Sequence, residues 1–61
     1  MAKKSFFAIV DIEVPGGVIA DCDYSATWEE KDITDKNIAM AVAAQAKCSW
    51  YDVNVKRVRI F

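Results

Sequence analysis

Four carboxylates stand within the first 23 residues of the chain and are the residues best suited to chemistry. They are Asp11, Glu13, Asp21 and Asp23. Paired carboxylates can do acid–base work or hold a hard cation such as Mg²⁺ or Ca²⁺. The sequence lacks the rest of such a site, because it has no histidine, no glycine-rich phosphate loop and no EF-hand spacing. We therefore expect no metal and no catalytic role, and two interpretations stay open: a solvated face that pairs with the chain's own basic residues, or a docking patch for a basic partner.

A basic patch near the end of the chain has the opposite charge. It consists of Lys56, Arg57 and Arg59. Basic side chains together with aromatic residues such as Phe7 and Phe61 are typical of sheets on which single-stranded nucleic acid stacks its bases. The net charge of −1 and the pI of about 5.1 argue against that function, because nucleic-acid binders usually have a basic surface. We keep nucleic-acid binding as an alternative, beside a mixed surface that only protects an edge strand from aggregation.

The two cysteines, Cys22 and Cys48, point to no covalent chemistry. Without histidine or a C-x-x-C pair the sequence offers neither a zinc site nor a conventional base for a nucleophile. It shows no targeting segment and no apolar stretch long enough to span a membrane. We expect a cytoplasmic protein with reduced cysteines, no cofactor, no membrane association and no enzymatic activity.

The pattern of apolar residues predicts the elements that must position these side chains. Residues 5–14 and 18–28 alternate with period two around the turn-forming segment Pro15–Gly17, which predicts a β-hairpin. A helix follows, with Thr34 as its N-cap and Lys47 near its end. Residues 51–61 form a third strand, in which the alternation slips between Val55 and Val58. Either a bulge lies at Lys56-Arg57, as is common for such slips, or one half of the strand faces the wrong way.

These elements predict a single α+β domain, residues 1–61, with the order β-β-α-β. One helix packs on one face of a three-stranded sheet. We prefer the strand order 2-1-3, with the third strand antiparallel to the first, because the first strand is the most apolar and central strands are the most buried. The order 1-2-3 is the alternative.

The helix is rich in alanine and has no fully polar side. We predict a buried stripe of Ile38, Ala41 and Val42, completed by Gln45 or Ala46. Met40, Ala43, Ala44 and Lys47 then face outward.

One helix leaves the second face of the sheet uncovered. If Val14 pairs with Val18 across a three-residue loop, Phe7, Ile9 and Ile19 lie on that face among the carboxylates. The register then places Glu13 opposite Ile19, Asp11 opposite Asp21, Ile9 opposite Asp23 and Phe7 opposite Ser25. Apolar residues on an uncovered sheet face indicate a contact surface, and we predict an interface of Phe7, Ile9, Ile19 and Phe61. The alternatives are scattered surface apolar residues, which are normal, and cover by a tail or by a bent third strand.

The length of 61 residues supports an interaction role, because a domain of about 60 residues is only marginally stable. Such domains are stabilised by disulfides, by a metal or by a partner subunit. We expect a small non-enzymatic protein–protein interaction module that forms a homodimer. Its size and lack of a site are typical of accessory proteins or inhibitors encoded by phages and other mobile elements, with a host or phage protein as a further partner. The alternatives are a single-stranded nucleic-acid-binding protein and a structural subunit of a larger assembly.

Overall fold

Apolar residues alternate along the first strand, and this alternation places them together on the buried face of the sheet. The computed structural model describes residues 2–61, so residue 1 of the predicted domain lies outside the described residues. Strand β1 (Lys3–Val14) buries its even-numbered side chains Phe6, Ala8, Val10 and Ile12. The odd-numbered side chains point to the opposite face, as the pleat of a strand requires.

A two-residue turn joins β1 to strand β2 (Gly17–Glu29). Val14 lies opposite Gly17, so the predicted pairing of Val14 with Val18 across a three-residue loop is wrong. Two residues are enough because Pro15 presets the first corner of the turn and Gly16 adopts a φ of +95° at the second. Hairpin formation itself is confirmed.

Short 3₁₀ helices flank the single α-helix. They are η1 (Glu30–Asp32) and η2 (Trp50–Asp52), on either side of α1 (Asp35–Ala46). The Thr34 hydroxyl accepts a hydrogen bond from the Asn37 backbone N–H at 3.2 Å, so the predicted N-cap is confirmed. The helix ends where Lys47 adopts the left-handed conformation with φ of 57°.

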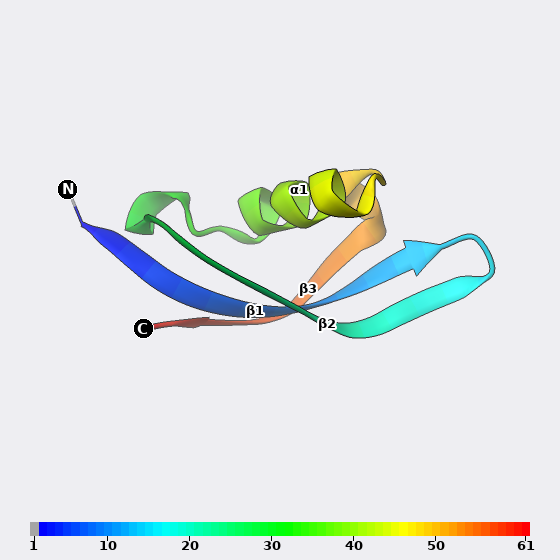
Figure 1. Cartoon of the computed structure of the whole chain (residues 1–61), viewed down its shortest axis with the longest axis horizontal. Helices are drawn as coiled ribbons and strands as arrows, with labels where there is room; N and C mark the ends of the chain where they lie inside the picture. Colours follow the sequence, from blue (N-terminus) through cyan, green and yellow to red (C-terminus); the bar gives the residue numbers. More distant parts are fainter. Residues whose placement is uncertain (1) are drawn as a thin grey trace.

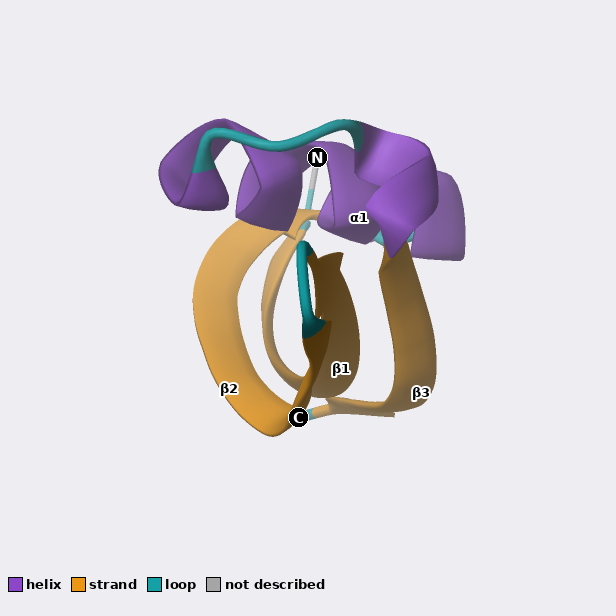
Figure 2. Cartoon of the chain, turned by 90° about the vertical axis from the view of Figure 1, so that its right-hand side faces the viewer, coloured by secondary structure: helices purple, strands orange, loops and turns teal. Residues whose placement is uncertain are grey.

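Strand β3 (Val53–Ile60) completes an antiparallel sheet with the order β2-β1-β3 (Figure 1). The predicted α+β class, the β-β-α-β order and the strand order 2-1-3 are confirmed. Figure 2 shows the helices as one layer above a strongly curved sheet. Among residues 2–61, no helix has the length and apolarity needed to cross a membrane.

The core lies between α1 and the central part of the sheet and is entirely apolar. Its buried residues are Phe6, Ala8, Val10, Ile12, Ile38, Ala39, Val42, Ala43 and Val53.

The buried stripe of α1 differs from the predicted one. Ala39 and Ala43 are buried, whereas Ala41 is only half-buried and both Gln45 and Ala46 are exposed. The physical reason is that α1 packs closer to β3 and η2 than to β2. This position turns the small side chains of Ala39 and Ala43 toward the core.

Candidate protein-binding surface

Two β-bulges flank the same point of the central strand. On one side, Ala20 and Asp21 of β2 together oppose the single residue Asp11. On the other side, Lys56 of β3 is an extra residue, because Ile9 pairs with Arg57 and Val10 pairs with Val55. The predicted bulge at Lys56-Arg57 is therefore confirmed. A bulge leaves one residue unpaired and bends the strand, and here both strands that flank β1 are bent at one level.

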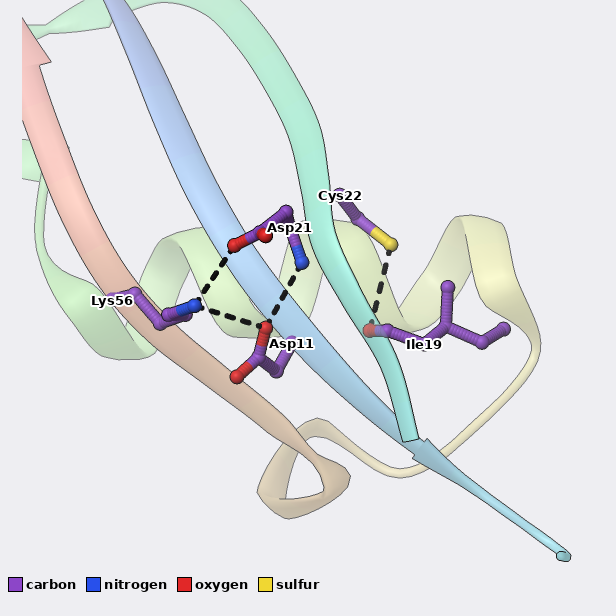
Figure 3. A network of polar contacts seen from close by, with 5 residues as sticks. All are labelled: Asp11, Ile19, Asp21, Cys22 and Lys56. Carbon is purple, nitrogen blue, oxygen red and sulfur yellow. Dashed lines mark hydrogen bonds and ion pairs between the residues drawn. The ribbon is translucent and has the colours of Figure 1, made fainter. Parts of the chain in front are cut away.

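The extra residues of the two bulges meet each other across β1 (Figure 3). The Lys56 Nζ donates a hydrogen bond to Asp21 Oδ1 at 2.8 Å and lies 3.6 Å from Asp11 Oδ1. The Asp21 backbone N–H, which a bulge would leave unpaired, donates to Asp11 Oδ1 at 3.0 Å. Asp11 and Asp21, which the predicted register placed opposite each other, are thus held together by the ammonium group of Lys56 and the backbone N–H of Asp21.

This contact shifts the ionisation of both charged partners. The hydrogen bond from Lys56, with the attraction of its charge, lowers the pKa of Asp21 below its ordinary value of 3.8. The hydrogen bond to Asp21, and then the charges of Asp11 and Asp21, raise the pKa of Lys56 above 10.5. Both shifts favour the charged forms, so the network is an ion pair across the whole neutral pH range.

Between the turn and the bulge in β2, the observed register differs from the predicted one. Ile12 lies opposite Ile19 and Glu13 lies opposite Val18, so the predicted pair Glu13–Ile19 is wrong. Residues directly opposite each other point to the same face, and Ile19 therefore shares the helix side of the sheet with Ile12. Ile19 does not share a face of the sheet with Phe7 and Ile9. The shorter turn moves the register by one residue, and the bulge restores it beyond Asp21.

Beyond the bulges, the predicted register is confirmed. Ile9 pairs with Asp23 and Phe7 pairs with Ser25. We call the sheet side that carries the odd-numbered residues of β1 the open face, because α1 covers the other side. Phe7 and Ile9 lie on it and are half-buried rather than fully exposed.

The open face is organised in rows across the three strands. One row has Ile9 at its centre, with Asp23 on β2 and Arg57 on β3. The next row has Phe7 at its centre, with Ser25 on β2 and Arg59 on β3.

Phe61 extends the same face. Its N–H donates to the Ser5 carbonyl at 2.9 Å, which continues the ladder of β3, and its side chain is 69 % exposed. Because Ile60 pairs with Phe6 on the helix side, the alternation places Phe61 on the open face. Phe7, Ile9 and Phe61 of the predicted interface are thus on one face, and Ile19 is not.

The acidic and basic patches neutralise each other only in part. Lys56 holds Asp11 and Asp21, while Glu13 lies farther along β1, opposite Val18. Within residues 2–61, Asp23, Arg57 and Arg59 form no ion pair. In the same residues, no group of three His, Cys, Asp or Glu side chains is arranged to hold a metal ion.

A hollow of about 320 Å³ lies over Ile9 on the open face. It is lined by Ile9, Asp21, Asp23, Lys56 and Arg57. One wall is therefore acidic and comes from β2, the other is basic and comes from β3, and the floor is apolar. Such a hollow suits a charged or hydrogen-bonding group of a partner protein better than a purely apolar one.

Sequence reasoning missed a second concave surface on the helix side. Because α1 lies toward β3, the inward residues of β2 are only half-buried, and a groove of about 540 Å³ runs between β2 and α1. Its apolar lining comes from Trp28, Met40 and Ala41. The sequence contained a sign of this groove, because the inward apolar residues of β2 extend over more of the sheet than one short helix can cover. Both cysteines lie half-buried and are free.

Comparison with known proteins places no relative beside this chain. No family model, no curated protein and no solved structure matches it.

Proposed function

We propose that the chain is a non-enzymatic protein-interaction module that forms a homodimer through its open face. The observation that carries the proposal is the pair Phe7 and Ile9, which lie on the side of the sheet that α1 does not cover. Their partial exposure is apolar surface that a second copy would remove from water, at a gain of roughly 25 cal/mol for each Å².

The size of the molecule determines what fraction of its surface such a contact must cover. A stable interface of standard size buries about 800 Å² on each partner. The whole chain exposes 4290 Å². A contact of that size would therefore cover a little under one fifth of the molecule, which requires the open face to be used along several rows rather than at one residue.

The proposal extends to an accessory or inhibitory role encoded by a phage or another mobile element. Its support is the small size and the lack of a catalytic motif in the sequence. Such a protein acts by occupying a surface of another protein, and a dimer offers each of its remaining surfaces twice.

Sedimentation equilibrium over a concentration series tests the homodimer. We expect the wild type to associate from 6.8 kDa to twice that mass at micromolar concentrations. The double variant Phe7→Glu/Ile9→Lys should stay monomeric, with a helical and strand signal in circular dichroism that matches the wild type.

A matched control places the same two charges on the helix side. Met40 and Ala44 are both exposed on α1, so Met40→Lys/Ala44→Glu should leave both folding and association unchanged. A wild type that is monomeric at high micromolar concentration contradicts the proposal. Particles much larger than a dimer favour a structural subunit instead.

Single-stranded nucleic-acid binding is the second candidate function, and one observation favours it. Phe7, Arg57, Arg59 and Phe61 occupy adjacent rows of the same face. Fluorescence anisotropy with a labelled oligothymidine tests it. The dimer proposal expects only weak, salt-sensitive binding, whereas salt-resistant binding that Phe7→Ala abolishes would favour nucleic acid.

A further inference from the structure

The two charges that flank Ile9 on the open face are arranged so that this row is complementary to itself. Resting on the proposed homodimer, we infer that two copies meet about a two-fold axis parallel to β1, with Arg57 of each copy paired to Asp23 of the other. The partner for this surface is therefore a second copy of the chain in one defined orientation.

The row through Ile9 carries opposite charges on its two sides. Asp23 and Arg57 both lie opposite Ile9, one on each side. Neighbouring strands are about 4.8 Å apart, so the backbones of Asp23 and Arg57 lie about 10 Å apart across the sheet. Neither forms an ion pair within residues 2–61, and each is therefore free to pair with another molecule.

Two-fold symmetry can pair these opposite charges between two copies. A two-fold axis parallel to β1 turns the second copy over and exchanges its two flanking strands, so that β3 of one copy lies over β2 of the other. The same operation keeps each row at its own level. Arg57 then lies over Asp23 of the partner subunit, and the reverse contact follows from the symmetry of an isologous interface. Each arginine then lies at the acidic edge of the other copy's hollow, formed by Asp21 and Asp23, rather than over its apolar floor.

The neighbouring row fits the same orientation. Arg59 and Ser25 both lie opposite Phe7, on β3 and β2. The axis parallel to β1 brings Arg59 of one copy over Ser25 of the other, where a guanidinium N–H can donate to a hydroxyl oxygen. Phe7 and Ile9 then lie against the same residues of the second copy, between two polar flanks.

The other face-to-face arrangement has the opposite electrostatics. A two-fold axis across the strands at the level of Ile9 would place β3 over β3 and β2 over β2. Arg57 would then face Arg57, and Asp23 would face Asp23. Like charges held opposite each other disfavour association, so the charges that flank Ile9 favour the axis parallel to β1.

Lys56 does not take part in this selection. Its ammonium group is already held by Asp21 and Asp11 of its own chain. The ion pairs between copies therefore come from Arg57 and Asp23 alone, and this leaves a small set of variants for the test.

Charge reversal measures the orientation directly. In the inferred dimer, Asp23→Arg places Arg57 opposite an arginine twice, and Arg57→Asp places Asp23 opposite an aspartate twice. Each single variant should weaken the dimer about tenfold or more in sedimentation equilibrium. The double variant Asp23→Arg/Arg57→Asp should recover the wild-type dissociation constant. Lys31→Glu, on η1 and away from the open face, is the matched control and should have no effect.

Mixing the two single variants adds a second measurement. A heterodimer of Asp23→Arg with Arg57→Asp contains two favourable pairs, so the mixture should dimerise more tightly than either variant alone. If the wild type forms a dimer that Phe7→Glu/Ile9→Lys dissociates, but neither single charge reversal weakens it, the inferred orientation is wrong and the homodimer stands. If the wild type is monomeric, the homodimer itself fails.

Discussion

Asp21 and Lys56 are the unpaired residues of two bulges on opposite sides of β1, and their side chains meet at 2.8 Å. Thirty-five positions separate them in the sequence. The pair joins the two edge strands over the central strand, at the level where both edge strands bend. A surface ion pair contributes little to stability by itself, so the two bulges, rather than this contact, determine where the sheet bends. The rows of Ile9 and Phe7 begin immediately beside it.

The pH dependence of stability should reveal this pair. Asp21 has a lowered pKa in the folded chain, so its contribution is present above the unfolded pKa and is lost as pH falls through the folded pKa. Lys56 has a raised pKa, so its contribution is present below 10.5 and is lost as pH rises through the folded pKa. We expect Asp21→Asn to be less stable than the wild type at pH 7 and equally stable once the pH lies below the folded pKa of Asp21.

Urea unfolding followed by circular dichroism at a series of pH values measures this difference. Asparagine adopts the left-handed conformation as readily as aspartate, so the φ of 55° at this position is tolerated in the variant. A difference in stability that persists unchanged in acid would show that the ion pair is not its cause.

Phe6 and Phe7 are adjacent residues with opposite roles, and their alanine variants should separate folding from association. Phe6 is 1 % exposed and packs on Trp28 with ring centroids 4.8 Å apart, so Phe6→Ala should cost about 3–5 kcal/mol. For a chain of this length that is a large part of the total stability. Phe7→Ala should remain folded and lose self-association. Thermal unfolding and sedimentation on both variants check this, and a Phe6→Ala variant as stable as Phe7→Ala would contradict the assignment of faces.

The N-cap of α1 should contribute measurably, because a 12-residue helix depends on its ends. The Thr34 hydroxyl accepts the Asn37 N–H, and Thr34→Ala leaves that donor without its side-chain acceptor. We expect a loss of about 0.5–2 kcal/mol in urea unfolding. Thr34→Ser keeps the hydroxyl and should be close to the wild type. Equal losses in both variants would mean that the methyl group of threonine, rather than the cap, is responsible.

Lys47 ends α1 in a conformation that is strained for a side chain with a Cβ. Its φ of 57° is the left-handed value for which glycine is the usual residue. Relief of the left-handed strain, about 1–2 kcal/mol, outweighs the roughly 0.4–1 kcal/mol that the greater entropy of an unfolded glycine costs, so Lys47→Gly should stabilise the chain by up to about 1 kcal/mol. Lys47→Ala removes the charge without relieving the backbone and is the control. A Lys47→Gly variant no more stable than Lys47→Ala would show that the left-handed conformation costs little here.

The local elements follow from the sequence because their signals are local. Period-two alternation around Pro15-Gly16 determines the hairpin, Thr34 determines where α1 begins, and the slip at Lys56 marks the bulge in β3. The strand order follows from one physical requirement, since the most apolar strand is stabilised most by the central place. These features need no knowledge of which residues far apart in the sequence meet.

Features that depend on contacts between residues far apart in the sequence were decided by the tertiary structure. The bulge at Asp21 gives no sign in the sequence, because it arises from fitting a two-residue turn to a register set by the core. The shorter turn places Ile19 on the helix side, and the bulge restores the predicted register beyond Asp21. The displacement of α1 toward β3 likewise depends on packing, and it opens the groove beside Trp28. The identity of the residues is enough to show that Asp23 and Arg57 carry opposite charges. Only the two strand pairings, each on its own side of β1, placed them on opposite sides of Ile9.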